Sequence, residues 1–80
     1  MRIDKVNGNC NICGTRVREA RERAGLSQEQ LAAKIQLFGH PLTQKAISCI
    51  ETGFRIVPDF ELPLFAEVLN VSVQWLLGLE

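Results

Sequence analysis

Four glycines divide this 80-residue chain into segments of helical length. Gly25, Gly39, Gly53 and Gly78 each follow a run in which apolar residues recur every three or four positions, the spacing of one helix face. Glycine commonly ends a helix because it adopts the left-handed conformation without steric cost. No stretch alternates apolar and polar residues as a half-buried strand does. The sequence therefore predicts an all-α fold, a compact bundle of five short helices.

The second and third predicted helices carry strong start signals. Ser27 precedes the second, and Gln30 stands three residues later, which is the spacing of a capping box. Thr43 is the expected cap of the third. The second helix is expected to end near Phe38, with Pro41 just beyond it. Two well-defined helices thus follow one another along the chain.

The other helices have weaker signals. The first is expected from Thr15, the fourth has Pro63 in its first turn, and Ser72 caps a short fifth helix. Residues 1–10 are predicted to be a flexible N-terminal arm, and residues 11–80 a single domain. The expected inward-facing residues are Val17, Ala20, Arg21, Ala24, Leu31, Ala32, Ile35, Thr43, Ile47, Ile50, Phe54, Leu62, Phe65, Ala66, Leu69, Trp75 and Leu76.

Charge is balanced overall but divided along the chain. The nine Lys and Arg all lie at or before Arg55, where five of the nine acids also lie, so residues 1–55 carry 9 − 5 = +4 and residues 56–80 carry −4. Zero net charge argues against a general polyanion binder. The division suggests a surface for an anion beside a surface for another partner, although chance segregation in a short chain is the alternative.

Compartment signals are few. No apolar run approaches the roughly 20 residues of a membrane span, and no basic-then-apolar leader opens the chain. We therefore expect a cytoplasmic protein without a membrane partner, whose three cysteines are reduced.

The outer face of the third predicted helix is polar. Gln44, Lys45, Ser48 and Thr52 lie away from the isoleucines. A helix that follows another after a turn and leaves its polar face free is the arrangement that enters the DNA major groove. An amide suits adenine, and an ammonium suits guanine or a phosphate. A merely solvated helix face would be equally polar.

Two sequence motifs resemble those of a known protein family. "RVREARERAGLSQEQLAAKI" followed by "TQKAISCIETG" resembles the Cro/cI-type, or XRE, helix-turn-helix family, over roughly residues 11–78. The resemblance implies a helix-turn-helix DNA-binding domain of the kind found in lambdoid phage repressors. Two departures stand out: the segment from Gln36 to Leu42 is longer than the usual tight turn, and Arg55 alone supplies positive charge after the third helix.

The resemblance also implies residue roles. Arg21 and Glu51 match a partly buried ion pair between the first and third helices. Base-reading roles are expected for Gln44, Lys45, Ser48 and Cys49, and phosphate contacts for Gln28, Thr43, Thr52, Arg55 and Arg16.

The cysteines and the histidine are the candidate metal ligands of the chain. Cys10 and Cys13 could be half a zinc site, but only Cys49 and His40 remain as ligands, on separate elements. We expect no metal, no cofactor and no small-molecule substrate, with Cys13 as an apolar contact and His40 as a turn residue. No catalytic constellation is present in the sequence, so an enzyme is not expected.

The C-terminal segment "VSVQWLLGLE" has more apolar side chains than a short helix can hide. Leu77 and Leu79 are therefore expected to contribute to a homodimer. The sequence favours sequence-specific binding of double-stranded DNA by a small transcriptional regulator of repressor type. The alternatives are a protein–protein module on the same fold, such as an antitoxin or assembly partner, and a redox- or metal-responsive switch.

Overall fold

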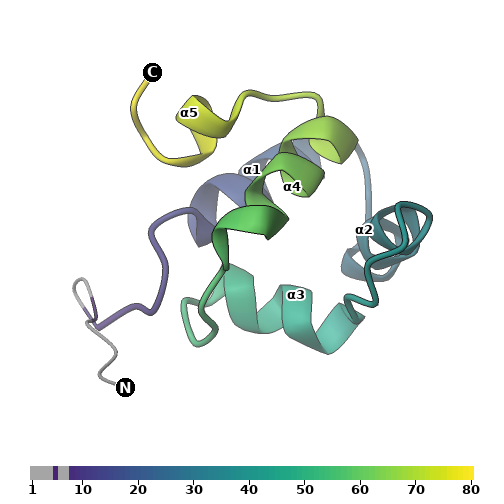
Figure 1. Cartoon of the computed structure of the whole chain (residues 1–80), viewed down its shortest axis with the longest axis horizontal. Coiled ribbons are helices and arrows are strands. Elements are labelled where there is room, and N and C mark those ends of the chain that lie inside the picture. The colour runs from purple at the N-terminus through teal and green to yellow at the C-terminus, as the bar shows by residue number, and fades with distance from the viewer. Residues whose placement is uncertain (1–4, 6–7) are drawn as a thin grey trace.

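The computed structural model of the chain describes residue 5 and residues 8–80. Within these residues there are five α-helices and one short 3-10 helix but no strand, which confirms the all-α prediction (Figure 1). No helix in this part of the chain combines the length and apolarity that crossing a membrane requires. The elements are α1 (Gly14–Arg23), α2 (Gln28–Gln36), α3 (Gln44–Glu51), the 3-10 helix η1 (Asp59–Glu61), α4 (Leu62–Leu69) and α5 (Val73–Leu76).

Side-chain caps begin three of the helices. The Ser27 hydroxyl accepts from the backbone N–H of Gln30 while the Gln30 side chain accepts from the N–H of Ser27, which completes a capping box. Thr43 caps α3, and Ser72 caps α5. These bonds satisfy backbone donors that a helix start would otherwise leave unpaired.

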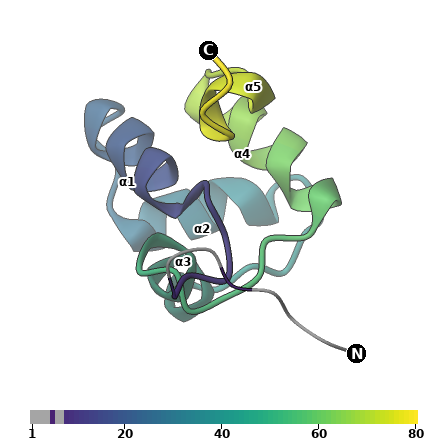
Figure 2. The ribbon, with the colours of Figure 1, turned by 90° about the vertical axis from the view of Figure 1, so that its left-hand side faces the viewer.

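The core lies between helices that meet at several angles. In Figures 1 and 2, α3 and α5 lie at opposite ends of the molecule, with α1 and α4 between them. This arrangement leaves one side of α3 without a covering helix (Figure 1). The fully enclosed apolar side chains are Val17, Leu31, Ile35, Ile47, Ile50, Phe65 and Leu76.

Some inward-facing predictions were wrong. Phe54 is 79% exposed, because α3 ends at Glu51 and Gly53, with a φ of 85°, turns the chain away from the helical path. Ala24 is exposed because it lies just beyond the last turn of α1. Thr43 is exposed at the cap of α3. The predictions for the fifth helix were right, since Leu76 is enclosed and Trp75, although half-buried, packs against the core.

Gly14 brings α1 and α3 into direct contact. A Cβ built on Gly14 would lie 2.2 Å from the carbonyl oxygen of Ile50. Asn11 supports the same junction, since its Oδ1 accepts from Gly14 N–H at 2.8 Å and its Nδ2 donates to the Ile50 oxygen at 3.0 Å. The start of α1 is therefore fixed against the last turn of α3.

Most of the predicted flexible arm lies outside the described residues. Its last part is in contact with the domain, because Cys10 N–H donates to the Gly53 oxygen at 2.7 Å. The boundary between arm and domain stays a prediction.

Candidate nucleic-acid interface

The outward side of α3 carries the predicted base-reading residues. Gln44 and Lys45 are exposed at its first turn, and Ser48 and Cys49 are half-buried further along. The opposite side, with Ile47 and Ile50, is enclosed. The structure therefore places the four candidates on or beside one accessible surface.

A chain of polar contacts leads from this surface into the protein. Gln44 Nε2 donates to Gln28 Oε1 at 2.7 Å, and Gln28 Nε2 donates to Glu51 Oε1 at 3.0 Å. Gln28 opens α2 and Gln44 opens α3, so the contact joins the first residues of the two helices. Each glutamine keeps further donor and acceptor capacity for a ligand, because an amide offers two donors and two lone pairs.

Arg21 and Glu51 form the innermost part of this chain. Arg21 Nε donates to Glu51 Oε2 at 2.7 Å and Nη2 donates to Oε1 at 3.1 Å, a bidentate geometry. The hydrogen bond to Glu51 raises the pKa of the Arg21 guanidinium above its ordinary value, although burial opposes this. The pair connects α1 to α3 with little exposure of either charge.

The predicted phosphate contacts do not all lie together. Gln28 and Thr43 stand at the starts of α2 and α3, close to Gln44. The Thr52 hydroxyl donates to the backbone oxygen of Ser48 at 2.9 Å, within its own helix. These three residues belong to the ends of the two helices of the motif.

Arg16 lies elsewhere. Its Nη1 donates to the backbone oxygen of Trp75 at 3.0 Å, and its guanidinium stacks 4.6 Å from the centre of the indole ring. Trp75 belongs to α5, at the far end of the molecule from α3 (Figures 1 and 2). The structure therefore does not bring Arg16 to the α3 surface.

Arg55 is close to α3 but its charge is already paired. Its two terminal nitrogens donate to the two oxygens of Glu61 at 2.7 and 3.0 Å. The hydrogen bond to Glu61 raises the pKa of Arg55. Among the described residues, Lys45 takes part in no ion pair, so it is the cation that α3 presents outward.

A shallow groove of about 640 Å³ runs along the outward side of α3. Phe54 and Ile56 form an apolar edge to it, and both are exposed. Its lining residues are Cys10, Thr43, Lys45, Ala46, Cys49, Phe54, Arg55 and Ile56.

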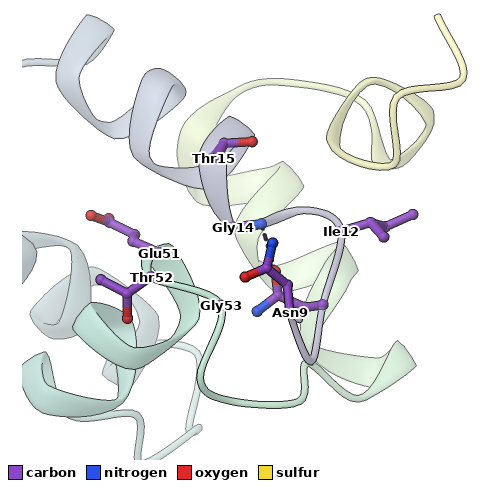
Figure 3. Close-up of a pocket in the computed structure, with 8 residues that line it drawn as sticks. Asn9, Ile12, Gly14, Thr15, Glu51, Thr52 and Gly53 are labelled. Atoms are coloured by element: carbon purple, nitrogen blue, oxygen red, sulfur yellow. Dashed lines mark hydrogen bonds between the residues drawn. The ribbon is translucent and has the colours of Figure 1, made fainter. Parts of the chain in front are cut away.

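A second cavity, of about 380 Å³, lies where the start of α1 meets the end of α3 (Figure 3). Its polar lining residues include Asn9, Thr15 and Thr52. Two glycines without side chains, Gly14 and Gly53, also line it. The cavity is thus part of the α1–α3 junction.

Glu61 was not singled out by the sequence, yet at 1% exposure it is the most buried charged residue in the part of the chain that the structure describes. Burial opposes its ionisation, but hydrogen bonds from Arg55 and His40 leave the pKa of Glu61 below its usual range. His40 Nε2 lies 2.7 Å from Glu61 Oε2, so the view of His40 as a simple turn residue was incomplete. The only sequence signal was an acid near Pro58 and an arginine six residues before it, which is too common to be informative.

The cysteines show no ligand cluster. Cys13 is buried, and this burial raises the pKa of its thiol. Cys10 and Cys49 are half-buried free thiols. Within residue 5 and residues 8–80, no group of three or more Cys, His, Asp or Glu side chains is placed to hold a metal ion.

Comparison with protein families agrees with this geometry. A family model described as Helix-turn-helix matches residues 17–76, which includes all of α2, α3 and α4. The match begins inside α1 and ends at the last residue of α5. The family is one of DNA-binding regulators, and this chain belongs to it as a Cro/cI-type, or XRE, helix-turn-helix protein.

Proposed function

We propose that this protein binds double-stranded DNA in a sequence-specific manner, reads bases with the exposed side of α3, and acts as a small transcriptional regulator of repressor type. The observation that carries the proposal is the 2.7 Å hydrogen bond from Gln44 to Gln28. It holds an exposed amide at the first turn of α3, where a helix in the major groove comes closest to base edges.

The two glutamines would have different tasks. Gln44 can donate and accept at once, which suits the N6 and N7 positions of adenine. Gln28 is held by Glu51 and lies at the start of α2, where a phosphate would also meet free backbone N–H groups. Phosphate contacts fix the register of a protein on DNA, and base contacts supply the preference.

Lys45, Ser48 and Cys49 complete the proposed reading surface. Lys45 can meet guanine or a phosphate, and the half-buried Ser48 and Cys49 can make short contacts. Lys45 is the cation on this surface, so we expect a modest electrostatic contribution, at about 0.9 in the salt slope for each neutralised phosphate.

The test begins with selection of bound sites from random duplex DNA. Gln44→Ala should then relax preference at one base pair of each half-site, since a good bidentate contact contributes about 1–3 kcal/mol of discrimination. Gln28→Ala should weaken binding to all sequences through the lost phosphate contact. Because Gln44 also loses its hydrogen-bond partner, this variant should relax preference at the same base pair by a smaller factor than Gln44→Ala. Glu29→Ala, on the exposed side of α2, serves as the surface control. Full retention of preference in Gln44→Ala at every position would contradict base reading by α3.

We also propose a homodimer formed through the C-terminal segment, because one helix reads too few base pairs for a specific site. Leu79 is 74% exposed and Leu77 is half-buried. Sedimentation of Leu79→Lys should show weaker association than the parent protein. A parent that remains monomeric both free and on DNA would contradict the dimer.

The competing function is a protein–protein module on this fold. It draws support from the large apolar side chains exposed outside α3, especially Leu37, Phe38 and Phe60. An absence of any preferred duplex in the selection would favour this function.

A further inference from the structure

We propose that Glu61 is a positioning residue for DNA reading, which sets the orientation of α3 by binding the two chain segments that flank this helix. The effect on DNA rests on the proposed function. The effect on the orientation of α3 does not, and it can be measured without DNA.

Both oxygens of the Glu61 carboxylate are used. Oε1 accepts from Arg55 Nη1 at 2.7 Å, and Oε2 accepts from Arg55 Nη2 at 3.0 Å. Oε2 also lies 2.7 Å from His40 Nε2. The carboxylate is almost completely excluded from solvent, so the three contacts cannot be exchanged freely for water.

The two partners stand on either side of α3. His40 lies in the segment that joins α2 to α3, and Arg55 lies in the segment that follows α3. Glu61 itself ends η1 and directly precedes α4. One carboxylate therefore connects the segment before α3 and the segment after α3 to the start of α4.

Short links connect each partner to α3 itself. Arg55 N–H donates to the Cys49 oxygen at 3.2 Å, and Asn11 Nδ2 joins the Arg55 oxygen to the Ile50 oxygen. On the other side, the His40 oxygen accepts from Leu42 N–H at 2.9 Å, immediately before the Thr43 cap. A tilt of α3 would therefore strain or break the contacts of Glu61.

The geometry of the Arg55–Glu61 pair is demanding. A guanidinium that meets a carboxylate through two parallel hydrogen bonds fixes direction as well as distance. Base contacts tolerate displacements of only about 0.5 Å before they weaken. A residue that acts on α3 through Arg55 and His40 can thus affect base preference without touching DNA.

The same geometry changes the role of Arg55. Its charge is balanced by Glu61, so Arg55 acts here as a structural partner rather than as the predicted phosphate contact. Arg55→Gln should consequently leave the salt slope unchanged, whereas loss of a phosphate contact would lower its magnitude by about 0.9. Arg55→Lys should reduce operator preference, because an ammonium keeps the charge but cannot form the two parallel hydrogen bonds to Glu61.

The main experiment compares the affinity for the selected operator with that for a scrambled duplex, over a range of salt concentrations. Glu61→Gln preserves the shape of the side chain and removes its charge. The ratio of operator to scrambled affinity should fall at least tenfold, while scrambled affinity should not fall, because Arg55 gains an unbalanced charge. Simple unfolding would lower both affinities together. A ratio within twofold of the parent's would overturn the proposal.

Leu69→Ala is the matched control. Leu69 is buried at the end of α4 and belongs neither to the contacts of Glu61 nor to the segment proposed for the dimer, so this variant should lose stability but keep the parent's ratio wherever circular dichroism shows it folded. If Glu61→Gln does not fold, His40→Phe replaces it. That variant removes one contact of Glu61 and keeps a ring beside Phe60, whose ring centre lies 5.9 Å from that of His40. It should shift the ratio in the same direction by a smaller factor.

Residual dipolar couplings of backbone amides test the orientation of α3 without DNA. In Glu61→Gln, or in His40→Phe, the couplings of α3 should no longer fit the parent's orientation relative to α1 and α4. Couplings that still fit it would overturn the inference even if the parent protein has a clear operator. The parent protein could instead prefer no duplex while α3 is reoriented in the variant. That result would refute the proposed function and support the role of Glu61 in orienting α3.

Discussion

Two buried glutamates connect α3 to the rest of the domain, and they do so in different ways. Glu51 belongs to α3 and binds Arg21 on α1 and Gln28 on α2. Its partners are on regular helices, and through Gln28 it connects directly to Gln44 on the exposed surface.

Glu61 lies outside α3 and binds residues of connecting segments, Arg55 and His40. It makes no hydrogen bond to the outward side of α3 among the described contacts. Glu51 therefore joins α3 to the helices beside it, whereas Glu61 binds the segments at the two ends of α3, through which we propose that it orients this helix. Variants on the two sides should therefore behave differently.

The largest effect is expected for the Arg21–Glu51 pair. Arg21→Met or Glu51→Leu should each lower the free energy of unfolding by up to about 3–5 kcal/mol, because each leaves a poorly solvated charge without its partner. The double variant should lose less than the sum of the two. Denaturant unfolding of the four proteins gives the coupling directly, and strictly additive losses would show that the pair contributes no coupling.

The next largest effect concerns the same α1–α3 junction. Gly14→Ala should destabilise the fold by about 1–3 kcal/mol, since its methyl group would meet the backbone oxygen of Ile50 and neither chain can move alone. Thr15→Ala, at the adjacent exposed position, should change stability by less than about 0.5 kcal/mol. Equal thermal stability of the two variants would mean that the junction relaxes freely.

The free energy of unfolding should depend on pH through the ionisation of Glu61. Its pKa is lower in the folded protein than in an ordinary glutamate, so its ionised form stabilises the fold above the usual glutamate range. This contribution is lost as pH falls through the folded pKa. The free energy of unfolding should decrease more steeply between about pH 6 and about pH 3 for the parent than for Glu61→Gln. Parallel curves would argue against an ionised Glu61 in the fold.

The smallest effect on stability is expected for Gln28→Ala. Gln28 is half-buried and links Glu51 to Gln44, and a hydrogen bond of this kind contributes about 0.5–1.5 kcal/mol. Arg21 still satisfies Glu51 in this variant, so the fold should remain. Amide side-chain resonances of Gln44 should show increased mobility, and unchanged Gln44 resonances would contradict the link.

Local sequence signals determined much of the fold. Ser27, Thr43 and Ser72 cap helices because a short hydroxyl side chain reaches backbone donors only two or three residues away. Asn70 takes the left-handed conformation at the end of α4, with a φ of 56°. These interactions depend on near neighbours, so the sequence predicts them without knowledge of the tertiary structure.

The sequence also predicted much of the candidate site, partly from the helical period and partly from the family resemblance. Gln44 and Lys45 are accessible because the helical period separates them from Ile47 and Ile50. Arg21 and Glu51 were expected to face one another from the family resemblance, and their separation of 30 residues is spanned by regular helices.

Only the tertiary structure decided the rest. Phe54 is exposed because Gly53 redirects the chain, and Arg16 reaches Trp75 rather than the α3 surface because α5 folds over α1. Glu61 meets His40 and Arg55 because two irregular segments converge on η1. The path of such segments has no sequence period. It is determined by where the packed helices place their ends, so contacts that depend on it appear only once the whole chain is folded.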